Sequence, residues 1–299
     1  MELTFLGTSC MVPTKERNVS SFYLSFRNEG ILFDCGEGTQ RQMNIVGIKR
    51  TSVTRILLSH WHGDHVSGLI GLIQTLGNEE NTPTLHVYGP QETKLRMAHL
   101  FNTCIFGNKI DIIVHEVHPK QLEKIEDCAE FEIWAAPLNH SIPCIGYIFV
   151  EKDRHNIDKK KMNILGIKEG PHVAELKAGK SIVYNKKKIY PKDMLITIPG
   201  KRVAYIADTA VCKSTMDLAN HADILVCEST YSHTHQEKAE KYCHLTATQA
   251  AQIASQSDAK KLYLTHFSQR YGGINQIEED AKAIFPNSIC ARDFLRVTI

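Results

Sequence analysis

The feature that most constrains this chain is one short segment, Ser59-His60-Trp61-His62-Gly63-Asp64-His65, which holds four side chains able to bind a metal ion. An apolar strand pattern, Arg55–Leu58, precedes it, and an apolar helix pattern begins at Val66. Gly63 permits the tight backbone path that such a connection needs. Imidazole and carboxylate ligands suit zinc. The spacing H-x-H-x-D-H therefore predicts a metal-binding loop between a strand and a helix.

Three more candidate ligands share one position, the carboxyl end of a predicted strand: His140 after Phe131–Ala135, Asp208 after Arg202–Ile206, and His266 after Lys261–Leu264. Taken singly, each is also explained as a cap, a turn residue or a core histidine with a partner. Taken with the four side chains of the motif, they make seven ligands. Seven ligands fit two metal ions that share one carboxylate.

The length and composition of the chain favour a layered α/β architecture. The chain has 299 residues, 42% of them hydrophobic, which is enough for a large core and for one or two domains. Strand-like segments recur along it, and helical patterns at residues 66–76, 91–100 and 245–255 lie between several of them. The sequence therefore predicts α and β elements layered over one or two sheets.

The N-terminus and the cysteines indicate where the protein resides. Residues 1–10 have a strand pattern and lack a basic region of the signal-peptide kind. The apolar runs are too short to span a bilayer. The nine cysteines are odd in number and scattered, with no C-x-x-C, so they are expected to be reduced, mostly buried small hydrophobic residues. We expect a soluble, cytoplasmic protein with no membrane partner.

Residues 151–190 differ from the rest of the chain in charge. They hold eleven Lys or Arg and five Asp or Glu, a net charge of +6, whereas the remaining residues carry a net charge of −4. The segment includes two lysine triplets, Lys159–Lys161 and Lys186–Lys188. Two interpretations stay open on charge alone: a solvated surface insertion, or an arm that binds a polyanion.

The order of the metal motif, then His140, Asp208 and His266, resembles the metallo-β-lactamase superfamily. The resemblance implies a four-layer αβ/βα sandwich, an α/β fold with the metals at one edge between two sheets. In dinuclear members it assigns the ligands to two zinc ions per subunit: His60, His62 and His140 to one, Asp64, His65 and His266 to the other, and Asp208 to both.

Several further motifs resemble tRNase Z, the endonuclease family that removes 3′ trailers from precursor tRNA. They are Pro13–Asn18 (P-x-x-x-R-N), Asp34–Gln42 (D-x-G-E-G-T-Q), Cys227–Thr230 (His-Glu-Ala-Thr), His244–Thr246 (H-x-T) and His266–Tyr271. The sequence departs from the third motif at Cys227 and Ser229 and keeps Glu228. The basic segment lies where tRNase Z carries its protruding tRNA-binding arm.

The resemblance implies a zinc-dependent endoribonuclease that leaves a 3′-hydroxyl on the tRNA. Asp64 would orient the attacking hydroxide, His244 would protonate the leaving oxygen, Glu228 would keep that imidazole charged, and Arg270 would clamp a phosphate. It also implies a homodimer, with residues 1–150 and 191–299 as the catalytic core and 151–190 as the arm.

Three alternatives stay open from the sequence. The first is a hydrolase of small esters or thioesters on the same fold, which would not need the basic arm. The second is an RNA-binding protein with a degenerate site, and the third is a di-iron oxidoreductase in the same ligand cage. The identity of the metal is also open, because zinc, manganese, iron and cobalt all accept these ligands.

Overall fold

The computed structural model describes residues 1–79, 82–105 and 109–299, which form two compact units. The core unit comprises Met1–Asp127, Ile133–Phe149 and Arg202–Ile299. The inserted unit comprises Cys128–Glu132 and Val150–Lys201. The basic segment of the sequence thus lies inside the inserted unit, which extends beyond it on both sides and recruits a short stretch from earlier in the chain.

The first sheet of the core unit is mixed, with an antiparallel half and a parallel half. In spatial order its described strands are β18 (Arg296–Thr298), β1 (Glu2–Gly7), β2 (Ser21–Phe26), β3 (Glu29–Phe33), β4 (Arg55–Leu57), β5 (Leu85–Gly89) and β6 (Ile112–Glu116). Pairing is antiparallel from β18 to β3 and parallel from β3 to β6. The carboxyl ends of β3, β4 and β5 therefore meet at one edge of the sheet.

The second sheet brings the other predicted strands together. Its described strands are, in order, β17 (Ser288–Cys290), β16 (Leu262–Thr265), β15 (Ile224–Glu228), β14 (Arg202–Ile206), β9 (Cys144–Glu151), β8 (Phe131–Leu138) and β7 (Glu123–Asp127). Strands β14 to β17 are parallel. Parallel pairing again places the residues that follow β14, β15 and β16 at a common edge.

Aromatic side chains pack the two sheets face to face. Phe22 of β2 meets Tyr205 of β14 edge-on, with ring centres 4.9 Å apart. Farther along the interface, Phe26 and Phe149 pack with centres 5.1 Å apart. All four side chains are buried. Such pairs contribute about 0.5–1.5 kcal/mol each beyond the burial of their area, so they help to fix how the sheets face each other.

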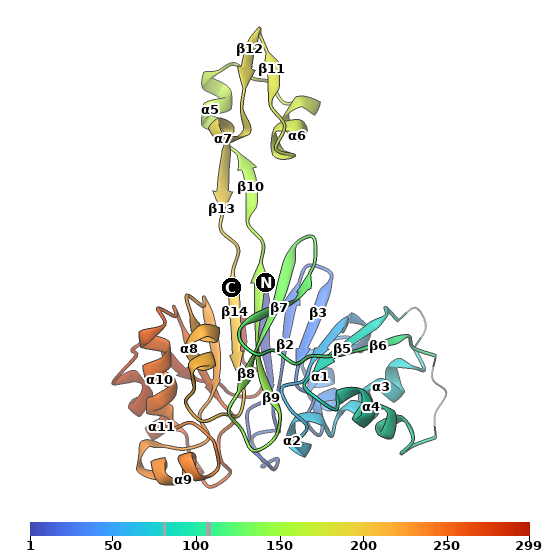
Figure 1. Cartoon of the computed structure of the whole chain (residues 1–299), viewed down its shortest axis with the longest axis vertical. Coiled ribbons are helices and arrows are strands. Elements are labelled where there is room, and N and C mark those ends of the chain that lie inside the picture. The colour runs from blue at the N-terminus through green and yellow to red at the C-terminus, as the bar shows by residue number, and fades with distance from the viewer. Residues whose placement is uncertain (80–81, 106–108) are drawn as a thin grey trace. The chain divides into compact units, whose positions relative to one another are not determined.

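Helices cover the outer face of each sheet (Figure 1). On the first sheet they are α1 (Thr39–Val46), α3 (Leu69–Leu76) and α4 (Thr93–Phe101), and on the second they are α8 (Lys213–Ala219), α10 (Ala247–Gln256) and α11 (Asn275–Lys282). The core unit is therefore a helix–sheet–sheet–helix stack, and the predicted four-layer αβ/βα sandwich is confirmed. In the described part of the chain, every helix is too short or too polar to span a bilayer.

The inserted unit has a hydrophobic core of its own. Its elements are β10 (Arg154–Ile157), α5 (Lys159–Ile164), α6 (Pro171–Lys177), β11 (Ile182–Tyr184), β12 (Lys187–Ile189), α7 (Pro191–Met194) and β13 (Leu195–Ile198). Strand β10 pairs with β13, and β11 pairs with β12 as a hairpin. The core side chains are Met162, Ile167, Leu176, Ile182, Ile189 and Met194. Both lysine triplets are exposed around this core, so they carry charge without a packing role.

Candidate metal centre

The metal motif begins as a loop after β4 and ends inside a short helix. His60 and His62 lie in the loop, whereas Asp64 and His65 belong to α2 (Gly63–Val66). The expectation of one helix starting at Val66 was therefore wrong: α2 ends there, and α3 starts at Leu69. At the break the Gly68 amide donates a 2.9 Å hydrogen bond to the Cys35 carbonyl and so leaves the helix, and the approach is so close that a Cβ at Gly68 would lie 2.2 Å from the carbonyl oxygen of Gly36.

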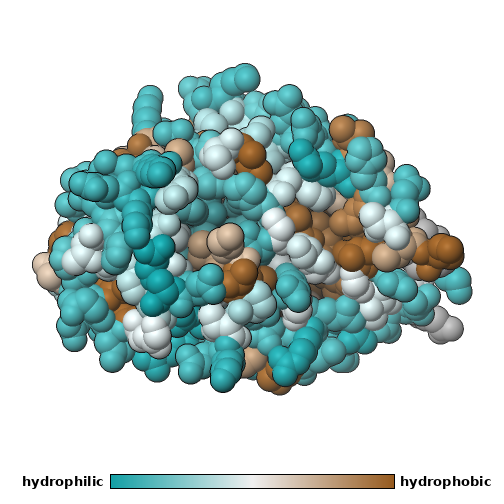
Figure 2. Space-filling view, turned by 90° about the horizontal axis from the view of Figure 1, so that it is seen from below, coloured by the Kyte–Doolittle hydropathy of each residue, from teal (hydrophilic) through white to brown (hydrophobic). Residues whose placement is uncertain are grey.

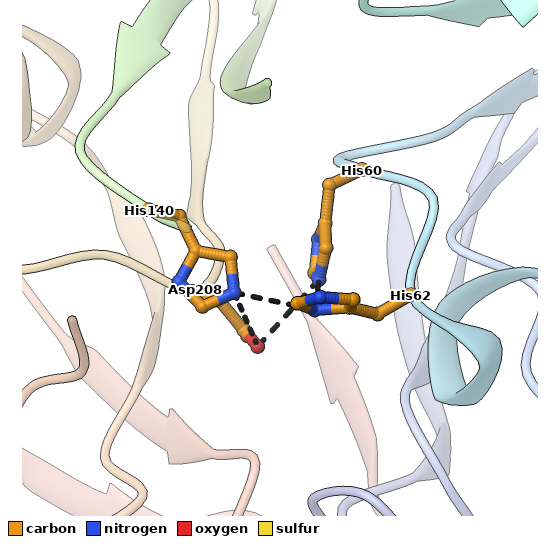
Figure 3. A group of neighbouring side chains, drawn as sticks. All are labelled: His60, His62, His140 and Asp208. Carbon is orange, nitrogen blue, oxygen red and sulfur yellow. Dashed lines mark hydrogen bonds and ion pairs between the residues drawn. The ribbon is translucent and has the colours of Figure 1, made fainter. Parts of the chain in front are cut away.

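The first group of candidate ligands comprises His60, His62, His140 and Asp208, whose ligand atoms all lie within 4.8 Å of one another (Figure 3). His62 Nδ1 lies 3.0 Å from His60 Nε2 and 3.3 Å from His140 Nε2. Asp208 Oδ2 lies 3.7 Å from His60 Nε2 and 4.0 Å from His140 Nε2. Side chains from three separate loops thus converge on one point.

The second group comprises Asp64, His65, His266 and, again, Asp208. His65 Nε2 and His266 Nε2 are 3.2 Å apart, and Asp64 Oδ2 lies 3.6 Å from the former and 3.4 Å from the latter. The other carboxylate oxygen of Asp208, Oδ1, lies 3.6 Å from His65 Nε2. Asp208 therefore presents one oxygen to each group.

The donor set fits a pair of cations. Asp208 is only 3% exposed, and its Oδ1 accepts no hydrogen bond from any described residue. His266 Nδ1 is 3.3 Å from that oxygen but forms no hydrogen bond to it, and the same nitrogen lies 2.9 Å from Thr230 Oγ1. A buried carboxylate oxygen without a donor is costly, and a cation would remove that cost. Five imidazoles and two carboxylates are also the donors that divalent transition metals prefer.

The two groups differ in their electrostatics when no metal is bound. Burial, reinforced by the charge of His65, lowers the pKa of His60 well below its usual value. Burial also acts to lower the pKa of His65 and of His266, but Asp208 and other carboxylate neighbours outweigh it and raise both well above the usual value. The first group therefore offers neutral imidazoles, whereas the second must release protons as a metal binds.

Four of the five ligand histidines, all but His62, have a second contact on the other ring nitrogen that orients the ring. Asp34 is fully buried, and its Oδ2 lies 2.8 Å from His65 Nδ1, while its Oδ1 accepts a 2.7 Å hydrogen bond from the Ser59 amide. Ser59 Oγ lies 2.9 Å from His60 Nδ1, and the Cys243 carbonyl lies 3.1 Å from His140 Nδ1. Such contacts fix ring orientation and tautomer.

The sequence analysis did not identify Asp34 as one of these orienting residues. A signal was present: Asp34 directly follows β3, at the carboxyl end of a strand, as Asp208 follows β14 nearby in the fold. Asp34 also belongs to the motif Asp34–Gln42 that resembles tRNase Z. The motif does not identify it as the partner of His65, because the two residues meet only when β3 pairs with β4, the strand that precedes the metal motif.

His244 forms a pair with Glu228 beside the two groups. His244 Nδ1 lies 3.0 Å from Glu228 Oε1 and 3.9 Å from Asp208 Oδ2. Glu228 is almost completely buried, and its Oε2 accepts a 2.7 Å hydrogen bond from the Thr230 hydroxyl. Burial alone would lower the pKa of His244, but the charge and hydrogen bond of Glu228 outweigh it and raise the pKa above its usual value.

A cavity of about 740 Å³ opens onto these side chains. Its lining includes Asp64, His140, Asp208, His244 and Arg270. The Arg270 guanidinium carbon lies 5.1 Å from the centre of the Tyr231 ring, and its Nε donates a hydrogen bond to Ser268 Oγ. The face of the molecule at this end is largely hydrophilic, with scattered hydrophobic patches (Figure 2). All the predicted site residues thus border one cavity or the ligand groups directly beneath it.

The other motif residues fasten loops around the site. The Asn18 amide and the Gln42 side chain both donate to Asp293 Oδ2, at 2.7 and 2.9 Å, and the Thr8 hydroxyl donates to Asp293 Oδ1. Arg17 Nη2 donates a 2.8 Å hydrogen bond to the Tyr271 carbonyl. The Pro13–Asn18 and Asp34–Gln42 motifs therefore connect the N-terminal loop to the C-terminal part of the chain.

Comparison with known proteins shows similarity along the whole chain. Residues 1–286 match the family model described as Anti-Pycsar protein Apyc1. Ribonuclease Z from Pyrococcus horikoshii is 38% identical over 303 residues, covering 100% of this chain and 96% of that protein. Human tRNase Z, short form, has a TM-score of 0.75 at 26% identity, covering 100% of this chain and 99% of that one.

A more distant structure bears on the fold alone. The metallo-β-lactamase fold protein YhfI from Bacillus subtilis has a TM-score of 0.70 at 17% identity, covering 99% of this chain and 98% of that one. The predicted metallo-β-lactamase fold is thereby confirmed. The chain belongs to the ribonuclease Z family, and over residues 1–286 it also belongs to the family that the Apyc1 model describes.

Proposed function

We propose that this chain is a zinc-dependent endoribonuclease that removes 3′ trailers from precursor tRNA by two-metal hydrolysis and leaves a 3′-hydroxyl on the tRNA. Membership of the ribonuclease Z family supports the reaction and the substrate. A count of two metal ions is supported by Asp208, which presents one carboxylate oxygen to each of the two ligand groups. The alternative hydrolase of small esters or thioesters is not favoured, because the family relationship points to RNA.

The residues present would hold two zinc ions per subunit. His60, His62 and His140 would bind one ion, and Asp64, His65 and His266 the other, with Asp208 shared between them. When bound, two such ions supply a hydroxide nucleophile at neutral pH and neutralise phosphoryl charge. The Met11 amide donates a 2.7 Å hydrogen bond to Asp64 Oδ2, which fixes the carboxylate that would orient the attacking water.

The leaving oxygen needs a proton, and His244 is placed to give it. Glu228 raises the pKa of this imidazole, at the wall of the cavity, and so favours its charged form. Protonated His244 would donate to the ribose 3′-oxygen as the bond to phosphorus breaks, which completes the 3′-hydroxyl. Arg270, on the same wall, would bind a phosphate oxygen of the substrate through its planar guanidinium.

The inserted unit is the proposed tRNA-binding arm. Its exposed lysines would contact phosphates, and A-form helices hide their base edges in a deep groove, so recognition would follow shape and charge. The family resemblance further supports a cytoplasmic homodimer, in which the arm of one subunit holds the tRNA that the other subunit cleaves. Sedimentation of the full chain, alone and with precursor tRNA, tests the dimer.

The test of the function is cleavage of a precursor tRNA that carries a 3′ trailer, with and without a chelator. We expect chelator-sensitive cleavage next to the discriminator nucleotide, with a 3′-hydroxyl on the tRNA and a 5′-phosphate on the trailer. A sample that carries two metals per chain and leaves the precursor intact would refute the substrate. Simple esters and thioesters, assayed in parallel, test the alternative.

A further inference from the structure

We propose that the thiolate of Cys10 is an additional ligand of the metal ion that Asp64, His65 and His266 would hold. The inference rests on the proposed two-metal site and adds a sulfur donor to it. From the sequence, Cys10 is expected only to be one of nine reduced, mostly buried cysteines. Its place in the structure separates it from the other eight.

The position of the thiol is the first argument. The sulfur of Cys10, a carboxylate oxygen of Asp64 and a ring nitrogen of His266 all lie within 4.8 Å of one another. A thiolate and an imidazole on neighbouring positions of one zinc ion are separated by roughly 3.0–3.5 Å, from zinc–sulfur and zinc–nitrogen bonds of about 2.3 and 2.0 Å. Small side-chain rotations would therefore bring all three donors onto one ion.

The backbone around Cys10 is fixed against the second group. The Cys10 amide donates a 3.0 Å hydrogen bond to the carbonyl of Phe267, the residue after His266. The next amide, of Met11, donates to Asp64 Oδ2. Met11 adopts a positive φ of 69°, and the Val12 amide closes the turn on the Cys10 carbonyl at 2.8 Å. Cys10 is thus held, through Phe267 and Met11, beside two of the three residues whose ion it would share.

An independent observation indicates that a cation would be favourable at this place. Asp208 Oδ1, which faces His65 and His266, is buried and accepts no hydrogen bond from the described residues. Cys10 is partly buried and lines the same cavity as Asp64 and Asp208. Among the described residues, no other cysteine belongs to a group of donors of this kind. The Cys10 thiol therefore lines a cavity in which a cation would stabilise the buried carboxylate of Asp208.

A sulfur ligand would change which metals the second site prefers. The Cys10 thiol would lose its proton on binding, because the thiolate is the ligand form. Soft thiolate ligands favour zinc or cadmium over manganese and magnesium, which prefer oxygen donors. Cys10 would accordingly make the second site selective for the softer metals, whereas the first group holds only nitrogen and oxygen donors.

Spectroscopy of the cobalt-loaded full chain tests the sulfur ligand without reliance on activity. With two cobalt ions per chain we expect a sulfur-to-cobalt charge-transfer band in the near ultraviolet. The band should vanish in Cys10→Ala and persist in Cys243→Ala, since Cys243 lines the same cavity but belongs to no donor group. Absence of the band from the wild type, or its persistence in Cys10→Ala, would overturn the proposal.

X-ray absorption of the zinc-loaded wild type needs no variant and separates the two proposals. A sulfur scatterer at about 2.3 Å is expected, and a shell of nitrogen and oxygen only would refute the role of Cys10. Precursor tRNA cleavage is measured on the same sample. Cleavage without zinc–sulfur contact refutes only the Cys10 ligand, zinc–sulfur contact without cleavage refutes only the function, and failure to bind metal refutes both.

Discussion

Nδ1 of His244 lies 3.0 Å from Oε1 of Glu228, a carboxylate that is 1% exposed and is also bonded by Thr230. This contact keeps the imidazole charged: burial acts to lower the pKa of His244, and Glu228 outweighs burial and raises it. A group that acts as an acid is active below its pKa, so the rate of cleavage should fall as the pH rises through the pKa of His244.

Replacing Glu228 with Gln should therefore move the alkaline limb of the pH–rate profile to lower pH. The side chain keeps its size but loses the charge that raises the pKa of His244. His244→Ala should lower kcat by about 10²- to 10⁴-fold, the range for loss of a general acid. The measurement is single-turnover cleavage of precursor tRNA across pH at saturating zinc. Glu237→Gln, the same change at an exposed site on a neighbouring helix, is the control. An unmoved limb in Glu228→Gln would show that Glu228 does not set the charge of His244.

Asp34→Asn should weaken metal binding at the second group. The substitution removes the negative charge 2.8 Å from His65 Nδ1 while the hydrogen-bonding shape is kept. Loss of such an orienting contact typically costs 10- to 100-fold in metal affinity. Competition with a chromophoric chelator measures the two dissociation constants, and only one of the two should change. Asp111→Asn, at an exposed position, serves as the comparison. Unchanged affinity in Asp34→Asn would mean that packing alone orients His65.

Asp293 should make stability depend on pH in a specific direction. Burial raises the pKa of its carboxyl from 3.8 to about 6, against the hydrogen bonds from Asn18 and Thr8. The native state therefore holds a proton that the unfolded chain has lost between these values. The stability that this proton contributes is fully present below about pH 4 and is lost as the pH rises through 6, and the shift corresponds to about 3 kcal/mol at most.

Urea denaturation of metal-free wild type and Asp293→Asn at several pH values measures this linkage. The variant cannot titrate at this position, so the wild type should lose stability relative to it as the pH rises from about 4.5 to 7.5. A constant difference between the two proteins over this range would show that Asp293 is already ionised in the native state. The comparison with the variant removes the contribution of the histidines, which titrate in both chains.

Changing Lys186, Lys187 and Lys188 together to Ala should weaken binding of precursor tRNA and lower its dependence on salt. All three are exposed on or beside the hairpin of β11 and β12, outside the small hydrophobic core, so the fold of the inserted unit should survive. Each lost phosphate contact lowers the slope of log K against log salt by about one. A matched variant replaces three exposed lysines of the core unit, Lys49, Lys213 and Lys282. Equal slopes in the two variants would contradict a binding role for the hairpin.

Much of the metal centre could be predicted from the sequence because its ligands are local in pattern. The motif H-x-H-x-D-H is contiguous, and His140, Asp208 and His266 each follow a strand whose alternation of residues is visible. Parallel pairing brings the positions after β14 and β16 to one edge of the sheet, so the convergence of Asp208 and His266 follows from the topology.

The contacts that support the ligands could not be predicted in the same way. Asp34 reaches His65 because β3 lies beside β4, and the break between α2 and α3 lies where Gly68 approaches Gly36 closely. Cys10 stands 54 residues before Asp64 and 256 before His266 along the chain, and only the fold places their donor atoms together. These relationships are properties of packing between distant segments, and no local pattern contains them.

The ligands of each proposed ion come from both halves of the sandwich. The motif residues follow β4 of the first sheet, whereas His140, Asp208 and His266 follow strands of the second. Between the sheets, aromatic pairs and the hydrogen bonds from the hydroxyls of Tyr205 to Asp34 and of Tyr147 to the Leu58 carbonyl already join the two halves. In mechanical terms, an ion held from both sides would act as a cross-link against shear, so that displacement of one sheet along the other and release of the ion become a single event.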